Sequence, residues 1–252
     1  MEPAAAGSEA AAAAAAAIET RDVGKTFGAV HAVDGVTLAL EPGRVYGLLG
    51  PNGSGKTTLI RLLMGLARPT SGQAYVLGVR MPKRENLGRI GYMTQADGVY
   101  AELSVWENLR FFATLYGPPD EAALKETLRL VELSGRRNTP AFELSGGMRR
   151  RLSLACALAH RPTVMFLDEP TVGVDPALRV QFWDHFRRLA AEGNTLLVSS
   201  HVMDEADRCD ELLLMRAGRI IARGTSAEIR REAGTDDLEG AFLKLAPAGD
   251  AQ

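Results

Sequence analysis

The stretch Gly50-Pro51-Asn52-Gly53-Ser54-Gly55-Lys56-Thr57-Thr58 decides the fold of this chain. An apolar run at residues 45–49 precedes it and a helical pattern at 59–64 follows it, so its glycines lie where a strand passes into a helix. Glycine lets the backbone adopt positive φ and bring its N–H groups close to an anion, and the N-terminus of the new helix adds its own attraction. Because every fixed position of the pattern G-x-x-x-x-G-K-[ST] is filled, we predict a phosphate-binding loop rather than an ordinary glycine-rich turn.

Two side chains of this loop indicate what it binds. Lys56 is expected to bring a positive charge to the β- and γ-phosphates of a nucleotide. The hydroxyl of Thr57 is expected to bind Mg²⁺, which prefers oxygen ligands. The loop therefore predicts a nucleotide with its magnesium ion.

Composition limits the other possibilities. The chain has 252 residues, of which 46% are hydrophobic and 24% charged, enough for one α/β core with or without a smaller subdomain. The net charge of −2 does not favour nucleic acid as a partner. The two cysteines, Cys156 and Cys209, are far apart and suggest reduced thiols that are neither catalytic nor metal-binding. No apolar run approaches the roughly 20 residues that span a bilayer, so we expect a membrane to be reached through a partner.

The N-terminal third contains a leader and a strand-rich region. Residues 1–17 end in eight consecutive alanines and are expected to be a disordered leader. Two strand-like segments follow at 18–25 and 33–40. Phe27 lies at the predicted turn between them, where its ring could either pack in the fold or stack on a nucleobase.

Beyond the loop helix, short strands are predicted at 74–77 and 90–93, and Gln95 follows the second. The Gln95 amide can serve a metal, a water or a phosphate, although alone it is typical of an ordinary surface residue. Helical periodicity then replaces strands from residue 103 to about 138, beginning at Ser104 with a capping box to Glu107. We interpret residues 101–160 as an inserted helical subdomain with an exposed docking face.

A second glycine motif, Leu144-Ser145-Gly146-Gly147-Met148, precedes a long helical run. Ser145 is the expected N-cap, and Gly146 and Gly147 leave the helix N-terminus open to an anion. The motif alone only suggests a phosphate site. The arginines at positions 149–151 point to different sides of a helix and are interpreted as a solvated or ion-paired surface rather than a nucleic-acid patch.

Two strands end in groups suited to phosphate chemistry. The apolar run 163–167 leads to Asp168 and Glu169, which a parallel sheet would deliver to the edge where α/β folds bind ligands. We expect Asp168 to bind Mg²⁺ beside Thr57 and Glu169 to act as general base toward a water. The strand at 195–200 ends at His201, which is well placed to contact a terminal phosphate.

Over residues 18–225 these stretches, in this order and approximate spacing, resemble the ATP-binding subunit of ATP-binding cassette (ABC) transporters. The resemblance implies a P-loop NTPase core of α/β class, with a mixed, mainly parallel sheet, an N-terminal antiparallel β subdomain and an inserted α-helical subdomain. It implies ATP and Mg²⁺ as cofactors. The cassette is expected to span residues 18–235, followed by a C-terminal helix and tail at 236–252.

The resemblance also implies roles for single residues. Phe27 matches the aromatic residue that stacks on adenine, and Gln95 the residue that links Mg²⁺ and water to the membrane partner. Asp175 resembles the loop acid that communicates between the two sites of a dimer, and His201 the histidine that holds the γ-phosphate.

The second glycine motif matches the signature that closes over the ATP of the opposite subunit, through Ser145, Gly146 and Gly147. Met148 stands where the family commonly has glutamine, but the phosphate-facing groups would be Ser145 and the glycine N–H groups, so we expect the site to remain competent. Because both halves of the site are otherwise intact, we expect a nucleotide-dependent homodimer, with a paralogue as the other possible partner. The stretches 172–176 and 237–245 are similar to those of the daunorubicin-resistance-like exporter ATPases.

The sequence therefore predicts an ATPase that drives export of a drug-, lipid- or polysaccharide-like substrate through a separate permease, at the cytoplasmic face of a membrane. One alternative is a soluble cassette ATPase that acts on ribosomes or DNA. The single cassette, the mildly acidic charge and the lack of a long coiled-coil insertion argue against it. A P-loop kinase or GTPase is the other alternative, and the signature motif and His201 argue against that.

Overall fold

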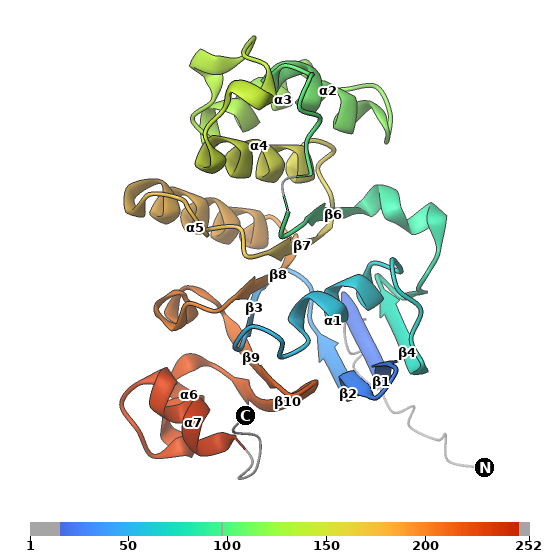
Figure 1. Ribbon diagram of the computed structural model, residues 1–252, viewed down its shortest axis with the longest axis vertical. Helices are drawn as coiled ribbons and strands as arrows, with labels where there is room; N and C mark the ends of the chain where they lie inside the picture. The colour runs from blue at the N-terminus through green and yellow to red at the C-terminus, as the bar shows by residue number, and fades with distance from the viewer. Residues whose placement is uncertain (1–15, 97, 247–252) are drawn as a thin grey trace, which may run out of the picture.

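The computed structural model describes residues 16–96 and 98–246 (Figure 1). The predicted leader and tail fall mainly on residues 1–15 and 247–252, which lie outside the described residues. Ala17, which we assigned to the leader, is only 2% exposed. Its N–H donates to the carbonyl of Leu40 and its carbonyl accepts from the N–H of Leu77, each at 2.8 Å. Ala17 therefore belongs to the packed N-terminal region and not to a disordered leader.

The larger sheet has six strands in the order β10-β9-β3-β8-β7-β6. Their bounds are β3 (Val45–Leu49), β6 (Ile90–Met93), β7 (Val164–Asp168), β8 (Thr195–Ser200), β9 (Glu211–Arg216) and β10 (Arg219–Gly224). All neighbouring pairs are parallel except β9 and β10. Every residue of β3, β7 and β8 is buried, as expected for parallel strands covered on both faces. The predicted mixed, mainly parallel sheet is confirmed.

The smaller sheet is antiparallel and has the order β2-β1-β4-β5. Its strands are β1 (Ile18–Phe27), β2 (Val30–Leu40), β4 (Ser71–Val76) and β5 (Val79–Arg80). The predicted N-terminal antiparallel subdomain is confirmed. Phe27 pairs with Val30 and is thus the last residue of β1, not part of a turn as expected. The turn is tighter than the sequence suggested because only two residues separate the strands.

Helix α1 (Lys56–Leu63) lies between the two sheets (Figure 1). Its buried Ile60 belongs to the same hydrophobic core as Val36 of β2 and Leu48 of β3. The apolar face of α1 is therefore covered on both sides, which holds the N-terminus of the helix, and the phosphate loop before it, against the main sheet.

The inserted helices α2 (Val105–Thr114), α3 (Glu121–Leu130) and α4 (Gly146–Leu158) form one end of the molecule (Figure 1). Ser104 and Glu107 form the expected capping box, with hydrogen bonds of 3.2 and 2.8 Å. Helix α3 ends at Leu130, because Glu132 adopts φ of +52°.

Helix α5 (Pro176–Ala191) follows β7 and buries Phe182, Trp183 and Phe186 in the main core. Strands β9 and β10 form an antiparallel hairpin at the edge of the larger sheet. Helices α6 (Ser226–Ala233) and α7 (Leu238–Leu245) pack on each other at the opposite end of the molecule (Figure 1). The C-terminal helix was expected, whereas α6 was not. Among the described residues, none of the helices is long and apolar enough to cross a membrane.

Candidate active site

The phosphate loop connects β3 to α1, as its glycines predicted. Gly53 and Gly55 adopt φ of +81° and +107°, which side chains with a Cβ rarely tolerate. A Cβ on Gly50 would lie 2.1 Å from the carbonyl oxygen of Met215, and one on Gly55 would lie 2.2 Å from that of Ala32. Only glycine therefore allows this backbone to fold tightly against its neighbours.

The side chain of Lys56 lies inside the loop and contacts its backbone. Its side chain is 5% exposed, and its Nζ donates to the carbonyl oxygens of Gly50 at 2.7 Å and Pro51 at 3.0 Å. Burial lowers the pKa of this amine, while the nearby carboxylates of Glu169 and Asp168 raise it. The ammonium is thus held where the loop backbone would surround a phosphate.

Asp168 is the last residue of β7 and is 1% exposed. Its Oδ2 accepts a hydrogen bond from the Thr57 hydroxyl at 2.8 Å, and its Oδ1 accepts one from the Ser199 hydroxyl at 2.5 Å. The two residues predicted to bind Mg²⁺ are therefore in direct contact although 111 positions separate them. A hydroxyl and a carboxylate are the oxygen donors that Mg²⁺ prefers, so the residues present fit this ion.

Glu169 is the centre of the site. Its carboxylate lies 3.0 Å from Nδ1 of His201 and accepts a hydrogen bond from Nε2 of Gln95 at 3.5 Å. The side chain is 7% exposed, and the backbone adopts φ of +54°, which is uncommon for a residue other than glycine. The backbone N–H of Glu169 donates to both oxygens of Ser199, at 3.2 and 3.1 Å. Gln95 and His201, which follow β6 and β8, thus meet at the carboxylate of Glu169, which follows β7.

Ser199 is a residue that the sequence reasoning missed. It contacts both acids: its hydroxyl donates to Asp168, and its two oxygens accept from the N–H of Glu169. The signal was present, because Ser199 lies on the strand that ends at His201 and pairs with Asp168 in register. The role of Ser199 could not be recognised from the sequence, because a single serine in an apolar strand is not part of a motif.

Three other predicted residues lie apart from this centre. Phe27 is 54% exposed, with the Lys25 ammonium 4.9 Å from the centre of its ring. Asp175 is the N-cap of α5, its Oδ1 accepting from the N–H of Leu178 at 3.0 Å. Ser145 is the N-cap of α4, and its hydroxyl accepts a hydrogen bond from the N–H of Met148 at 3.3 Å. Within the described residues, no hydrogen bond joins Ser145 to the phosphate loop.

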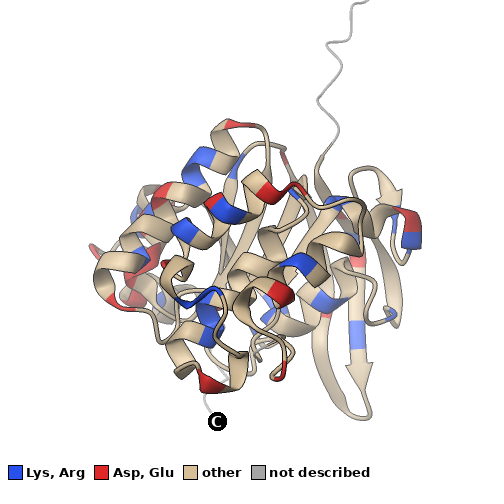
Figure 2. Cartoon of the chain, turned by 90° about the horizontal axis from the view of Figure 1, so that it is seen from above, with Lys and Arg blue, Asp and Glu red and all other residues tan. Residues whose placement is uncertain are grey.

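The interpretation of the three arginines was wrong for one of them. Arg150 is 7% exposed, and its guanidinium donates to backbone carbonyls next to Gln95 and at the end of β7. It is not part of a solvated surface. Figure 2 shows acidic and basic residues interspersed on the face that it presents, without a continuous basic stripe there.

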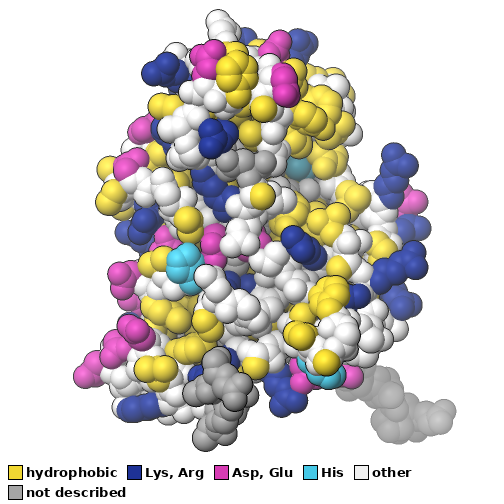
Figure 3. All heavy atoms as spheres, in the orientation of Figure 1, with side chains coloured by type: hydrophobic (Ala, Val, Ile, Leu, Met, Phe, Trp, Pro, Cys, Tyr) yellow, Lys and Arg dark blue, Asp and Glu magenta, His cyan; other side chains and the backbone are white. Residues whose placement is uncertain are grey.

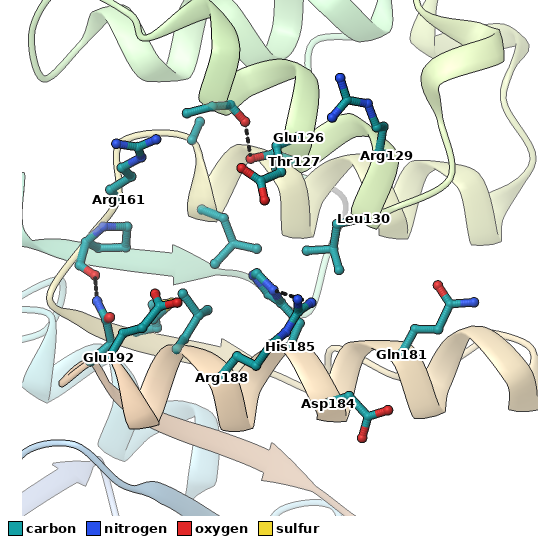
Figure 4. Close-up of a pocket in the computed structure, with 17 residues that line it drawn as sticks. Glu126, Thr127, Arg129, Leu130, Arg161, Gln181, Asp184, His185, Arg188 and Glu192 are labelled. Carbon is teal, nitrogen blue, oxygen red and sulfur yellow. Dashed lines mark hydrogen bonds between the residues drawn. The ribbon is translucent and has the colours of Figure 1, made fainter.

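A cavity of about 960 Å³ lies elsewhere, between α3, the end of α4 and α5 (Figure 4). Glu126 and Arg129 line it from α3, while His185 and Arg188 line it from α5. Burial and the charge of Arg188 lower the pKa of His185 to about 4. None of the predicted site residues lines this cavity, so it is separate from the phosphate loop.

The chain was compared with known proteins. The model of the family described as ABC transporter matches residues 33–172. The probable multidrug ABC transporter ATP-binding protein YbhF of Escherichia coli is 40% identical over 238 residues, which are 90% of this chain and 41% of that protein. The Nod factor export ATP-binding protein I of Burkholderia lata is 41% identical over 231 residues, which are 89% of this chain and 76% of that protein.

A solved structure is also similar. The dimeric structure of MJ0796, a bacterial ABC transporter cassette, has a TM-score of 0.77 and 25% sequence identity, and covers 82% of this chain and 98% of that chain. The chain thus spans nearly all of a solved cassette but less than half of the E. coli relative. The family match includes both glycine motifs, Asp168 at the end of β7, and Glu169 directly after it. The chain therefore belongs to the ABC transporter family, and its fold is that of the ATP-binding cassette.

Proposed function

We propose that this chain hydrolyses ATP as the nucleotide-binding subunit of an ABC exporter. The observation that carries the proposal is the meeting of Gln95 and His201 at the Glu169 carboxylate, directly beside the contact between Thr57 and Asp168. This arrangement places a base, its orienting partners and a pair of oxygen donors at the edge of the sheet where the phosphate loop opens. Phosphoryl transfer to water needs these groups in one place.

Each residue has a distinct task in this proposal. The loop N–H groups and Lys56 bind the β- and γ-phosphates, and the exposed ring of Phe27 stacks on adenine. Thr57 and Asp168 would hold Mg²⁺, which when bound neutralises part of the phosphate charge. Glu169 takes a proton from the attacking water. His201 and Gln95 orient that carboxylate and contact the terminal phosphate.

The second glycine motif completes the site from another subunit. Ser145 and Gly146 are exposed at the N-terminus of α4, so they are available to a second chain. Met148, which stands where the family commonly has glutamine, packs against the main core. We propose a homodimer in which Ser145, Gly146, Gly147 and the following loop acid Asp175 approach the ATP of the partner. The dimeric state of the similar cassette supports this arrangement.

The permease is the proposed membrane partner, and through it the chain would lie at the cytoplasmic face of a membrane. Large apolar side chains are exposed on and beside the inserted helices, at Tyr100, Phe111, Leu115, Tyr116 and Phe142. Figure 3 shows apolar side chains gathered at this end of the molecule. An apolar surface of this kind suits a protein partner, and the names of the relatives favour an export permease whose substrate resembles a drug or a Nod factor.

The central claim is tested with Lys56→Ala. Because Lys56 supplies the buried positive charge of the loop, its loss is expected to lower kcat/KM for ATP by about 100-fold or more. The matched control is Lys125→Ala, which removes an exposed lysine of α3 and should behave as wild type. Equal ATP hydrolysis by all three proteins would refute the proposal.

Coupling to transport needs its own measurement. We expect a neighbouring reading frame to encode a multi-span membrane protein, which should co-purify with this chain and change its rate of ATP hydrolysis. Stimulation by ribosomes or DNA, without an effect of that membrane protein, would instead support a soluble cassette ATPase.

A further inference from the structure

Arg150 connects two segments of the active site through their backbones. It lies in the second turn of α4 and is 7% exposed. Its Nη1 donates to the carbonyl oxygens of Thr94 and Gln95, each at 2.7 Å. Its Nη2 donates to the carbonyl oxygens of Asp168 and Glu169, the latter at 2.7 Å. One side chain from α4 thus joins the segment after β6 to the end of β7.

A guanidinium group is suited to this task. It is planar, always charged and carries five N–H donors in a rigid fork, so it can hold several carbonyl oxygens at fixed relative positions. Charge-assisted hydrogen bonds of this kind are stronger than neutral ones. Without Arg150, four carbonyl groups at the site would lose this partner, and buried polar groups without partners are costly.

The bond to Glu169 has a specific consequence. Because Glu169 adopts φ of +54°, its backbone is in a region that the surrounding structure must enforce. Ser199 holds the N–H of Glu169, and Arg150 holds its carbonyl oxygen. The peptide groups on both sides of the general base are therefore fixed, which sets the direction in which its carboxylate points.

The same helix also begins with the second glycine motif. Ser145 is the N-cap of α4, and Arg150 follows five residues later on the continuous helix Gly146–Leu158. A displacement of the helix N-terminus is transmitted to Arg150, since a single helix of this length moves as a rigid element. Arg150 therefore links the surface that would meet a second copy of the chain to the catalytic groups of its own chain.

We propose that Arg150 is a positioning residue that sets Gln95 and Glu169 for hydrolysis when α4 engages the nucleotide of the partner subunit. This inference rests on the proposed function. Arg150 acts through the backbone carbonyl groups that it binds, among them those of Gln95 and Glu169.

The first test compares Arg150→Gln with Arg151→Gln. Arg151 is the matched control because its guanidinium contacts the Val131 carbonyl and Glu132, away from the site. We expect Arg150→Gln to lower kcat about 100-fold, the effect of misplacing a catalytic group, with KM for ATP within about twofold of wild type. Arg150→Lys keeps the charge and some donors and should recover part of the rate. Arg151→Gln should keep the wild-type kcat.

Thermal unfolding of the same proteins separates a positioning role from a folding role. The Lys variant should unfold closer to the wild-type temperature than the Gln variant does, yet remain slower than wild type in kcat. Equal kcat for Arg150→Gln and wild type would overturn the inference, and so would a loss confined to KM. A wild-type chain that does not hydrolyse ATP would overturn the proposed function instead, so the two failures are distinguishable.

Mixed dimers test the direction of the effect. The Glu169→Gln variant serves as the protomer that cannot hydrolyse ATP. When it is in excess, every active protomer forms a mixed dimer with it. Arg150→Gln mixed with this partner has its own Glu169 as the only base and should be slow. In the second mixture, wild type is combined with an excess of the double variant Arg150→Gln/Glu169→Gln, so the only active base, Glu169 of the wild-type chain, has an intact Arg150 beside it. Its rate of ATP hydrolysis should equal that of wild type mixed with the single variant Glu169→Gln. The reverse order of rates would overturn the inference, because it would place the action of Arg150 in the partner's site.

Discussion

The role of Glu169 can be tested with a substitution that replaces one carboxylate oxygen by an amide nitrogen. Glu169→Gln keeps the size of the side chain and can still contact His201, which lies 3.0 Å from the carboxylate. It cannot accept a proton from water, so we expect kcat to fall by about 10²- to 10⁴-fold while ATP binding persists. Nucleotide-bound dimer should therefore accumulate, as measured by size-exclusion chromatography with ATP.

The control for this substitution is Glu239→Gln, which removes an exposed carboxylate of α7. It should hydrolyse ATP at the wild-type rate and form no lasting dimer. Wild-type turnover by Glu169→Gln itself would show that another group accepts the proton.

Helix α5 depends on Asp175 for its start. The Asp175 carboxylate accepts from the N–H of Leu178 at 3.0 Å, and Pro176 occupies the first position of the helix. Asp175→Ala is expected to cost about 1 kcal/mol in the free energy of unfolding, the usual effect of losing an N-cap. Urea unfolding monitored by circular dichroism measures it.

Asp175→Asn separates this cap from the proposed role between subunits. Asparagine is an equally good N-cap, so the free energy of unfolding should stay within about 0.5 kcal/mol of wild type. If the carboxylate also acts at the dimer contact, ATP hydrolysis by the Asn variant should still fall. Full activity in a stable Asn variant would leave Asp175 with the capping role alone.

The local sequence pattern was sufficient to predict most of the helices and strands and the residues of the central site. The predicted ends of β6 and β8 agree with the structure because short buried strands bounded by polar residues leave little freedom. Thr57, Asp168, Glu169 and His201 could be placed together because each ends or follows a strand of one sheet. The glycine pattern of the phosphate loop supplied the remaining constraint.

Arg150 could not be found in this way. Helical spacing shows that its side chain points away from those of its neighbours, but not what lies on that side. Its contacts with Gln95 and Glu169 exist only after α4 packs beside β6. Helix α6 was missed for a related reason: its eight residues are mostly polar, and its buried side chain Ile229 is covered only by the C-terminal core.

The inserted helices and the main core meet at the cavity that contains His185, and this contact should depend on pH. The folded-state pKa of His185 is about 4, below the ordinary histidine value of 6.5, because burial and Arg188 disfavour the charged ring despite the opposing effect of Glu126. As pH falls from 6.5 toward 4, the unfolded chain gains a proton that the folded chain does not. The free energy of unfolding should therefore decrease over this interval.

His185→Gln removes this titration, so its urea midpoint should fall less than that of wild type between pH 6.5 and pH 4. His31→Gln, at an exposed position of β2, is the matched control and should keep the wild-type slope. Identical slopes for wild type and His185→Gln would show that the ring is not held neutral.

The strand order has a consequence for how the protein is made. β3, which carries the phosphate loop, lies between β8 and β9, and both are synthesised long after it. About 140 residues separate Thr58 from the end of β8, so the ribosome needs roughly 7 to 28 s to supply them at 5–20 residues per second. During that interval the loop has its full sequence but neither of the strands that support β3 in the sheet. A nascent chain should therefore bind nucleotide only after β9 has emerged.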